Sequence, residues 1–198
     1  PYKNSTVLET IINKFKIAGV KNFYLTLNYK KNLIKSYIDN KIDQINLNFI
    51  EEKKALGSAG AIAYLKTKMT KDFFLINCDT LANIDLEKVY KFHKNKKNDL
   101  TIIAANKNFS IPYGSCVLNK SGELEKIVEK KNYVELINIG MYVFSPKVLN
   151  KMKLNSKINM DQLIKKLKKL KMKIGVFPIN ENSWVDTGTL ENIILKKF

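Results

Sequence analysis

Strand-like and helix-like segments alternate along the N-terminal half of this chain. Short runs rich in β-branched and aromatic residues separate stretches in which apolar residues recur every three or four positions. Such alternation favours parallel strands, because each strand–helix–strand crossover is right-handed and brings the next strand back alongside the first. We therefore expect an α/β fold of Rossmann-like type, with three α/β/α layers and a mostly parallel central sheet. The expected helices are 7–15, 32–38, 58–69 and 86–94, and the expected strands are 23–27, 47–50, 73–76 and 100–104.

The pattern changes after Pro112. Residues 115–118 and 124–128 have strand patterns, and an Asn-Lys-Ser-Gly turn at 119–122 joins them. This arrangement predicts a β-hairpin inserted into the α/β frame. The remaining expected elements are a strand at 136–144, a long helix at 159–170 and a strand at 174–177.

The length of 198 residues and the hydrophobic content of 45% predict one domain over residues 1–198. No apolar run is long enough to span a bilayer, and the N-terminus lacks a signal-peptide pattern. The two cysteines, Cys78 and Cys116, lie in separate strand-like segments, which fits a reducing compartment. We expect a cytoplasmic protein without a membrane partner. The single histidine, His93, cannot build a His-based triad or metal cluster, so we assign it no role.

The net charge of +17 invites the hypothesis of nucleic-acid binding. All 35 basic residues are lysine, however, whereas base readout and phosphate clamping favour the bidentate fork of arginine. The lysines are also spread over the whole chain, as an A+T-rich genome would produce. We therefore interpret most of the charge as solvated surface and expect no nucleic-acid partner, with nucleic-acid binding as a minor alternative.

Two short acidic motifs stand where strands are expected to end. One is Asn-Cys-Asp, which ends at Asp79, and the other is Trp-Val-Asp-Thr-Gly, which carries Asp186. Ligands of open α/β sheets collect beyond the carboxyl ends of the strands, so both carboxylates can converge on one divalent cation. Either aspartate taken alone is better explained as a helix cap or a turn residue. The segment between them is what favours a joint site.

A turn of small residues at 57–60, Gly-Ser-Ala-Gly, precedes the first acidic motif. Gly57 and Gly60 let the backbone approach a ligand closely, because they carry no Cβ. A helix beginning near Ser58 would also present unpaired N–H groups to a phosphate. An ordinary loop can have the same residues, so the motif gains weight only from its position.

Six motifs follow one another along the chain: Glu-Lys-Lys-Ala-Leu-Gly-Ser-Ala-Gly from Glu52, Asn-Cys-Asp at 77–79, Ile-Pro-Tyr-Gly at 111–114, Glu-Lys at 129–130, Asn-Ile-Gly-Met-Tyr at 138–142 and Trp-Val-Asp-Thr-Gly at 184–188. In order and approximate spacing they resemble the sugar-1-phosphate nucleotidyltransferases, and the similarity covers essentially the whole chain. The likeness is strongest to bacterial enzymes related to mannose-1-phosphate and heptose-1-phosphate guanylyltransferases, which serve surface-polysaccharide synthesis.

The resemblance implies that a sugar 1-phosphate attacks the α-phosphorus of a nucleoside triphosphate and releases pyrophosphate. It also implies Mg²⁺ as the cofactor, held by the catalytic residues Asp79 and Asp186. Lys130 would be a further catalytic residue, because by analogy it holds the sugar phosphate. An exposed ion pair is the simpler interpretation of the Glu-Lys motif. Only the place of this motif in the family's order favours a binding role. The residues implied for the sugar phosphate are Gly114, Glu129, Lys130, Asn138 and Gly140.

For the nucleotide, the resemblance implies contacts from Glu52, Gly57, Ser58 and Cys78. A carboxylate accepts two hydrogen bonds, and the pairing edge of guanine presents two adjacent donors. We therefore expect Glu52 to select GTP, although the neighbouring Glu51 could be the residue in contact.

Two departures from the family's pattern lead to further expectations. The Gly-rich loop that wraps the triphosphate in the family has no counterpart after Pro1, so we expect the domain to be truncated at its N-terminus. Such a chain would lack the first strand and phosphate loop and would be nearly inactive. In addition, Cys78 replaces a usual glycine and Lys131 a usual proline. We expect Cys78 to be a small buried strand residue, because no catalytic base adjoins it.

Two alternatives to this enzyme remain open. A non-catalytic subunit that binds a nucleotide or a sugar phosphate would show the same motifs. A metal-dependent glycosyltransferase that uses nucleotide-sugars would be expected to show an Asp-x-Asp pair, whereas only Asp79 is acidic in its motif. A homo-oligomer is also possible.

Overall fold

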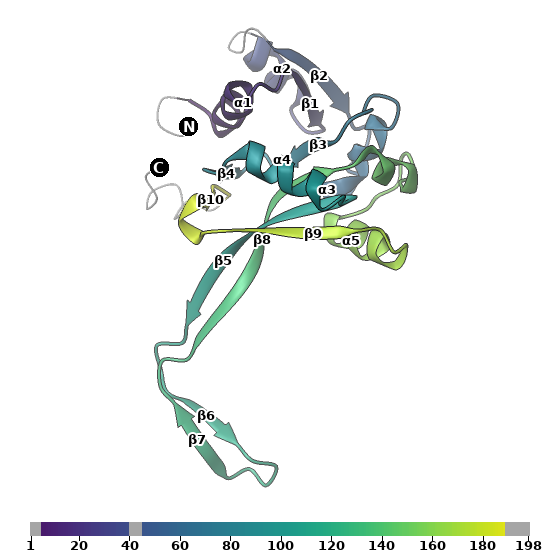
Figure 1. Ribbon diagram of the computed structural model, residues 1–198. Coiled ribbons are helices and arrows are strands. Elements are labelled where there is room, and N and C mark those ends of the chain that lie inside the picture. Colours follow the sequence, from purple (N-terminus) through teal and green to yellow (C-terminus); the bar gives the residue numbers. More distant parts are fainter. Residues whose placement is uncertain (1–4, 40–44, 189–198) are drawn as a thin grey trace.

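The computed structural model describes residues 5–39 and 45–188 and has the expected alternation of strands and helices (Figure 1). The α-helices are α1 Val7–Ile17, α2 Lys31–Asp39, α3 Gly57–Gly60, α4 Leu86–Asn95 and α5 Met160–Lys169, and the 3-10 helices are η1 Ala61–Leu65, η2 Pro146–Lys151 and η3 Glu181–Ser183. The strands are β1 Asn22–Leu27, β2 Asn46–Glu51, β3 Phe73–Ile76, β4 Thr80–Ala82, β5 Leu100–Ser110, β6 Ser115–Leu118, β7 Leu124–Val128, β8 Asn132–Phe144, β9 Ile174–Ile179 and β10 Trp184–Asp186. None of the helices in the described ranges is long and apolar enough to cross a membrane.

The helix ends are set by side chains that satisfy free backbone groups. At the start of α1, the hydroxyl of Thr6 accepts from the backbone N–H of Glu9 at 3.2 Å. The Glu9 carboxylate in turn accepts from the backbone N–H of Thr6 at 2.6 Å. This reciprocal capping box satisfies two donors that the helix itself leaves unpaired. Asn159 and Gln162 form the same arrangement at the start of α5.

The central sheet has the strand order β3-β8-β5-β9. Strands β3, β5 and β9 run in one direction, because β9 is parallel to β5 while β8 is antiparallel to both β3 and β5. Strand β8 departs from the parallel pattern because the chain returns to the sheet directly from the inserted hairpin, without a crossover helix. A second sheet pairs β1 and β2 in parallel.

Two hydrophobic clusters cover the two faces of the central sheet. Neighbouring residues of β8 point alternately into them: Tyr142 and Phe144 join the cluster with α5, whereas Met141 and Val143 join the cluster with α1 and α4. The period of two places helices on both faces, which is the three-layer arrangement expected from the sequence. The lysines of α5 lie on its outer side, since Leu163 and Leu167 turn inward and are fully buried.

Strands β5 and β8 extend well beyond the body as a two-stranded ribbon, and the hairpin β6–β7 continues it (Figure 1). We call residues 106–138 the arm, and none of them is buried. The hairpin strands have the bounds expected from the sequence, but the ribbon was missed. Both of its faces meet solvent, so it lacks the apolar face by which a strand is predicted.

The helix expected at 58–69 is much shorter in the structure. Helix α3 has four residues, and η1 carries the chain only to Leu65. Close packing explains the change: a Cβ on Gly60 would stand 2.7 Å from the backbone oxygen of Ser156, so the turn lies directly against another segment. The segment is thus shaped by this contact, with Ala61, Ile62, Ala63 and Leu65 all buried.

His93 is a core residue of α4, with 1% of its surface exposed. Its Nδ1 lies 2.8 Å from the hydroxyl of Thr101, and its Nε2 lies 3.7 Å from the Asp72 carboxylate. Burial lowers the pKa of His93, although the charge of Asp72 works in the opposite direction. The folded protein therefore favours the neutral imidazole.

We expect the free energy of unfolding to decrease as the pH falls from about 7.5 to about 5.5, because unfolded His93 takes up a proton near pH 6.5. The folded pKa lies below the unfolded one, so the stabilisation is complete above the unfolded pKa and is lost as the pH falls toward the folded pKa. The slope can reach at most about 1.4 kcal/mol per pH unit. Urea unfolding at both pH values should show the slope in the natural chain and a smaller one in His93→Gln. Equal slopes would refute this linkage.

Candidate active site

The two acidic motifs lie side by side because β4 pairs antiparallel with β10, with Thr80 opposite Asp186. The hydroxyl and the backbone N–H of Thr187 both donate to the backbone oxygen of Asp79, at 2.9 and 2.8 Å. The backbone N–H of Gly188 donates to Asp186 Oδ1 at 2.8 Å. A Cβ placed on Gly188 would stand 3.0 Å from Asp186 Oδ1 and 3.4 Å from Asp79 Oδ2. Both carboxylates therefore border one small space.

This pair of carboxylates suits a hard cation such as Mg²⁺. Magnesium commonly takes one or two protein carboxylates and completes its octahedral shell with water and phosphate oxygens. Across residues 5–39 and 45–188, no group of three or more His, Cys, Asp or Glu side chains could hold a metal. The donor set formed by Asp79 and Asp186 thus fits a cation that also binds a substrate, rather than a cation enclosed by protein alone.

Asn138 and Gly140 lie beside the end of β3, next to the first acidic motif. The backbone N–H of Asn77 donates to the oxygen of Gly140 at 2.9 Å, and the N–H of Gly140 donates to Asn138 Oδ1 at 3.1 Å. Asn138 Nδ2 donates to the hydroxyl of Tyr142 at 2.8 Å, which fixes the orientation of the amide. Gly140 has a φ of +75°, and a Cβ there would collide with the side chain of Asn77. Only glycine leaves room for this contact.

The small-residue turn faces the start of α5, and its N–H groups are used within the protein. The N–H of Ser58 donates to Asn159 Oδ1 at 3.3 Å, and the N–H of Ala59 donates to the oxygen of Ile158 at 3.1 Å. The expectation that these groups would be unpaired and available to a phosphate is therefore wrong in this structure. Hydrogen bonds to Ile158 and Asn159 pair the N–H groups of Ser58 and Ala59 instead.

The fit of Gly57 against that segment leads to a stability prediction. Gly57 and Gly19 both have positive φ, +77° and +87°, which costs a residue with a Cβ about 1–2 kcal/mol. A Cβ on Gly19 would meet nothing within 4 Å, whereas one on Gly57 would stand 2.7 Å from the oxygen of Ile158. We expect Gly57→Ala to lower the free energy of unfolding clearly more than Gly19→Ala in urea titrations. Equal losses in the free energy of unfolding would show that the backbone around Ile158 moves away from the added methyl group without cost.

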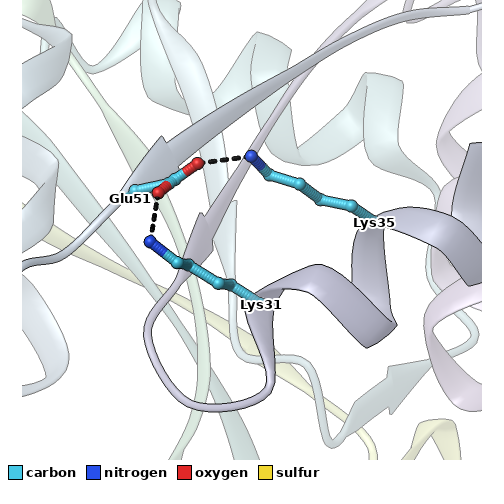
Figure 2. A network of polar contacts seen from close by, with 3 residues as sticks. All are labelled: Lys31, Lys35 and Glu51. Carbon is cyan, nitrogen blue, oxygen red and sulfur yellow. Dashed lines mark hydrogen bonds and ion pairs between the residues drawn. The ribbon is translucent and has the colours of Figure 1, made fainter.

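Glu51 and Glu52, the two candidates for a nucleobase contact, have different surroundings. Glu51 is exposed and lies between Lys31 and Lys35, with Lys31 Nζ 2.6 Å from its Oε2 (Figure 2). Hydrogen bonds from these lysines, first from Lys31, lower the pKa of Glu51 to about 2. Glu52 accepts one hydrogen bond from the backbone N–H of Leu56 at 3.1 Å. The carboxylate of Glu51 is thus held by two cations, while that of Glu52 meets a neutral donor.

Gly114, Glu129 and Lys130 lie on the arm, in the two connections between the ribbon β5–β8 and the hairpin β6–β7. A Cβ on Gly114 would stand 2.6 Å from Glu129 Oε1, so these two residues lie close together. All three residues are exposed. The structure places them on the arm and the aspartate pair on the body, so it does not bring the two groups together.

Cys78 is exposed in the turn after β3, so the expectation of a buried strand residue is wrong. The strand ends at Ile76, and the chain turns outward before the aspartate. Partial desolvation of the sulfur, followed by the negative charge of Asp79, raises the pKa of the Cys78 thiol. A thiol that is protonated at neutral pH is a poor nucleophile.

The motifs contained two further residues whose part in the site was not recognised from the sequence. Thr187 ties the two acidic motifs together, and Asn77 packs against Gly140. Their positions beside Asp186 and Asp79 were visible in the sequence, but the hydrogen bonds of Thr187 depend on the pairing of β4 with β10, and the contact of Asn77 depends on the pairing of β3 with β8. Three-residue strands are too short to be recognised from a pattern.

The sequence profile of the nucleotidyl transferase family matches residues 1–196, and the chain belongs to this family. Mannose-1-phosphate guanylyltransferase 1 of Arabidopsis thaliana is 29% identical over 163 residues, covering 77% of this chain and 45% of that protein. The D-glycero-alpha-D-manno-heptose 1-phosphate guanylyltransferase of Campylobacter jejuni is 27% identical over 199 residues, covering 97% of this chain and 85% of that protein. The chain thus spans less than half the length of the plant relative.

A solved structure supports the fold independently. HddC from Yersinia pseudotuberculosis, complexed with GMP-PN, superimposes with a TM-score of 0.74 at 22% identity. The match covers 98% of this chain and 84% of that one. The Rossmann-like α/β fold expected from the sequence is therefore confirmed.

Proposed function

We propose that this chain carries the catalytic site of an enzyme that condenses a nucleoside triphosphate, preferably GTP, with a sugar 1-phosphate to give a nucleotide-sugar and pyrophosphate. The observation that carries the proposal is the pair Asp79 and Asp186 around one space, beside Asn138 and Gly140. Membership of the nucleotidyl transferase family supports the reaction class. The names of the relatives, which are guanylyltransferases for mannose and heptose 1-phosphates, support the substrates.

The chemistry follows from the charges involved. An oxygen of the sugar phosphate forms a bond to the α-phosphorus, the bond from that phosphorus to the pyrophosphate oxygen breaks, and the pyrophosphate leaves with the electron pair. Asp79 and Asp186 would hold Mg²⁺, which when bound offsets the phosphate charge and helps to align the two oxygens. The half-buried position of both aspartates limits their contact with water and strengthens their electrostatic interactions.

The remaining residues would position the sugar phosphate. Asn138 and Gly140 form a fixed, hydrogen-bonded edge beside the aspartates. Lys130 would bind the sugar phosphate as a positive charge, and Glu129 would accept hydrogen bonds from sugar hydroxyls. We expect substrate binding to draw Glu129 and Lys130 toward the body, because one sugar phosphate can contact these residues and the aspartate pair only if they come together.

We infer that Glu52, rather than Glu51, reads the base, because Glu51 is already held by Lys31 and Lys35. Glu52→Gln should reduce the preference for GTP over UTP about 10-fold, because the second hydrogen bond from guanine then meets an amide N–H instead of a carboxylate oxygen. Glu51→Gln is the matched control and should keep the preference. Competition binding of GTP, UTP and dTTP measures both. An unchanged preference in Glu52→Gln would refute the assignment.

We infer a cytoplasmic, bacterial enzyme of nucleotide-sugar and polysaccharide biosynthesis. The two cysteines, Cys78 and Cys116, are free and exposed, which suits a reducing compartment. The bacterial heptose 1-phosphate relative supports the biosynthetic setting.

Pyrophosphate release tests the proposed reaction. A protein that includes the family's Gly-rich loop upstream of Pro1 would be given Mg²⁺ and each of GTP, UTP, dTTP and CTP against a panel of hexose and heptose 1-phosphates. Release should require both substrates and be fastest with GTP and one sugar. Release without any sugar phosphate, or none with any pair, would contradict the proposal.

A further inference from the structure

More than half of the net charge of this chain lies in one segment. Residues 147–173 carry ten of the 35 lysines but a single acidic residue, Asp161, so they hold +9 of the net charge of +17. The segment comprises η2, the loop after it, α5 and the turn that leads into β9. Nine of its ten lysines are exposed. Lysines occur along the whole chain, but here almost no acidic residue balances them.

The fold brings the ends of this segment together with the end of α4. The backbone N–H groups of Asp99 and Leu100 both donate to the oxygen of Lys173, at 2.8 and 3.2 Å. The N–H of Ser145, directly before η2, donates to the oxygen of Asp99 at 2.9 Å. The end of α4, the end of α5 and the start of η2 therefore lie side by side at the amino end of β5.

Exposed lysines follow both helix ends and the start of η2. We call them the amino-edge patch, which consists of Lys96, Lys97, Lys147, Lys171 and Lys173.

The charge of the amino-edge patch is not neutralised within the protein. None of its lysines forms an ion pair with a residue of the described ranges 5–39 and 45–188. The carboxylates that precede β3 and β5 are already engaged. Asp72 pairs with Lys94 at 3.1 Å, and Asp99 accepts the backbone N–H of Lys173 at 2.8 Å.

Two lysines of the patch occupy backbone positions that usually belong to glycine. Lys97 follows the C-cap of α4 with a φ of 51°, and Lys171 follows the C-cap of α5 with a φ of 56°. Both helices end in a Schellman motif, in which this position is left-handed. Glycine adopts that conformation without strain, and asparagine adopts it more easily than lysine. The helix dipole favours a cation there, but each last turn already supplies lysine.

The amino-edge patch lies at the opposite end of the central sheet from the aspartate pair. Strands β3, β5 and β9 run in one direction, and the patch precedes β5 and β9. Asp79 follows the carboxyl end of β3, and β10 with Asp186 follows the carboxyl end of β9. Figure 1 shows α5 at one end of β9 and β10 near the other. A partner bound to the patch therefore leaves the candidate active site open.

The side chains of this edge indicate which kind of polyanion fits. Lysine is a hydrated point charge, which suits phosphate groups on a surface. Recognition of nucleic acid favours arginine forks and aromatic rings, which contact and stack on bases. Neither arginine nor an aromatic residue occurs at 94–99, 145–151 or 168–174. The composition of the edge therefore favours an anionic lipid surface over nucleic acid.

An exposed apolar side chain supports the same partner. Leu170, between Lys169 and Lys171, is 48% exposed. An apolar side chain flanked by lysines can enter the headgroup region of a membrane, whereas a phosphate backbone offers it no apolar contact. Clusters of about four to eight basic residues are typical of sites that bind anionic lipids.

We propose that the amino-edge patch binds the surface of a membrane rich in anionic phospholipids, with Leu170 in the headgroup region and the aspartate pair on the side away from the bilayer. The association is peripheral and needs no membrane-spanning helix. It departs from the expectation of no membrane partner, because the order of lysines in the sequence does not reveal that three separate segments place them at one edge.

Co-sedimentation of the chain with vesicles tests the proposal without any substrate. The chain should sediment with vesicles that contain phosphatidylglycerol and stay in solution with pure phosphatidylcholine. Raising the ionic strength from about 0.1 M to about 1 M, which shortens the Debye length from about 10 Å to about 3 Å, should release it. Sedimentation with pure phosphatidylcholine, or none with phosphatidylglycerol vesicles, would overturn the proposal.

Lys97→Asn/Lys171→Asn removes two charges of the patch at positions whose backbone conformation suits asparagine. It should weaken binding to phosphatidylglycerol vesicles about 10- to 30-fold without lowering the unfolding midpoint. Lys30→Asn/Lys120→Asn is the matched control, since it removes the same charge outside the patch and Lys30 also has a positive φ, 52°. The control should bind like the natural chain. Equal weakening in both variants would show that binding follows net charge alone, which would overturn the assignment to the patch.

A competition experiment separates a membrane from nucleic acid. Duplex DNA of mixed sequence, at the same phosphate concentration as the lipid, should displace little of the chain from phosphatidylglycerol vesicles. Leu170→Ser should weaken vesicle binding but leave DNA binding unchanged. Complete displacement by the duplex, or undiminished vesicle binding of Leu170→Ser, would overturn the assignment to a membrane. None of these outcomes affects the proposed reaction, which pyrophosphate release tests separately.

Discussion

Asp186→Asn should lower the rate of pyrophosphate release by about 100- to 1,000-fold while leaving the unfolding midpoint nearly unchanged. The asparagine can still accept the hydrogen bond that Asp186 Oδ1 receives from the N–H of Gly188 at 2.8 Å, so the local structure should persist. The change removes one of the two negative charges that border the proposed cation site. Loss of rate without loss of stability is the signature of such a role. The measurement combines steady-state kinetics with thermal unfolding.

The matched control for this experiment is Asp161→Asn. Asp161 is exposed in the first turn of α5, where it pairs with Lys165 at 3.4 Å, far along the chain from either acidic motif. Surface pairs of this kind contribute little, so both rate and stability should stay close to those of the natural protein. If Asp186→Asn behaved like this control, the proposed role of Asp186 would be wrong.

Phe144→Ala should lower the free energy of unfolding by about 3–5 kcal/mol, the usual cost of deleting a buried aromatic side chain. Phe144 is fully buried at the end of β8. Its ring stacks on Phe73 at a centroid distance of 5.6 Å and meets the edge of Tyr142 at 6.1 Å. The alanine loses these contacts and leaves a cavity in a cluster that joins β3, β8 and α5.

Tyr29→Ala provides the comparison for the deletion of an aromatic ring. Tyr29 is 78% exposed, and its ring contacts the ammonium group of Lys30. We expect a loss of less than about 1 kcal/mol, because little apolar surface is removed from a packed environment. Urea unfolding of both variants checks the contrast. Similar losses would mean that the cluster around Phe144 repacks, contrary to its close packing.

The sequence predicted most reliably the elements whose ends are marked by both an apolar pattern and a turn. Strands β3, β6 and β7 have the expected bounds, because β3 is a short apolar run and β6 and β7 flank the Asn-Lys-Ser-Gly turn. The outer parts of β5 and β8 were missed, since residues 106–110 and 132–135 meet solvent on both faces. Burial imposes the pattern by which a strand is recognised, so a free ribbon leaves almost no signal.

The site could be predicted as far as the chain order of the motifs allows. The two aspartates were expected to converge, and the structure does place them around one space. Their binding of Mg²⁺ stays a prediction. The pairing of Ser58 with Asn159, across 101 positions of the sequence, could not be foreseen, because it depends on how α3 packs against the start of α5. The motifs thus predicted which two carboxylates lie together, and tertiary packing decided which backbone donors remain free.

Binding of Mn²⁺ as a substitute for Mg²⁺, measured by electron paramagnetic resonance in the presence of a non-hydrolysable GTP analogue, tests the central claim most directly. The claim is that Asp79 and Asp186 form one cation site that substrate phosphates complete. We expect one tightly bound Mn²⁺ per chain, with binding strongly weakened in both Asp79→Asn and Asp186→Asn but unchanged in Asp161→Asn. Undiminished binding in the first two variants would contradict the claim.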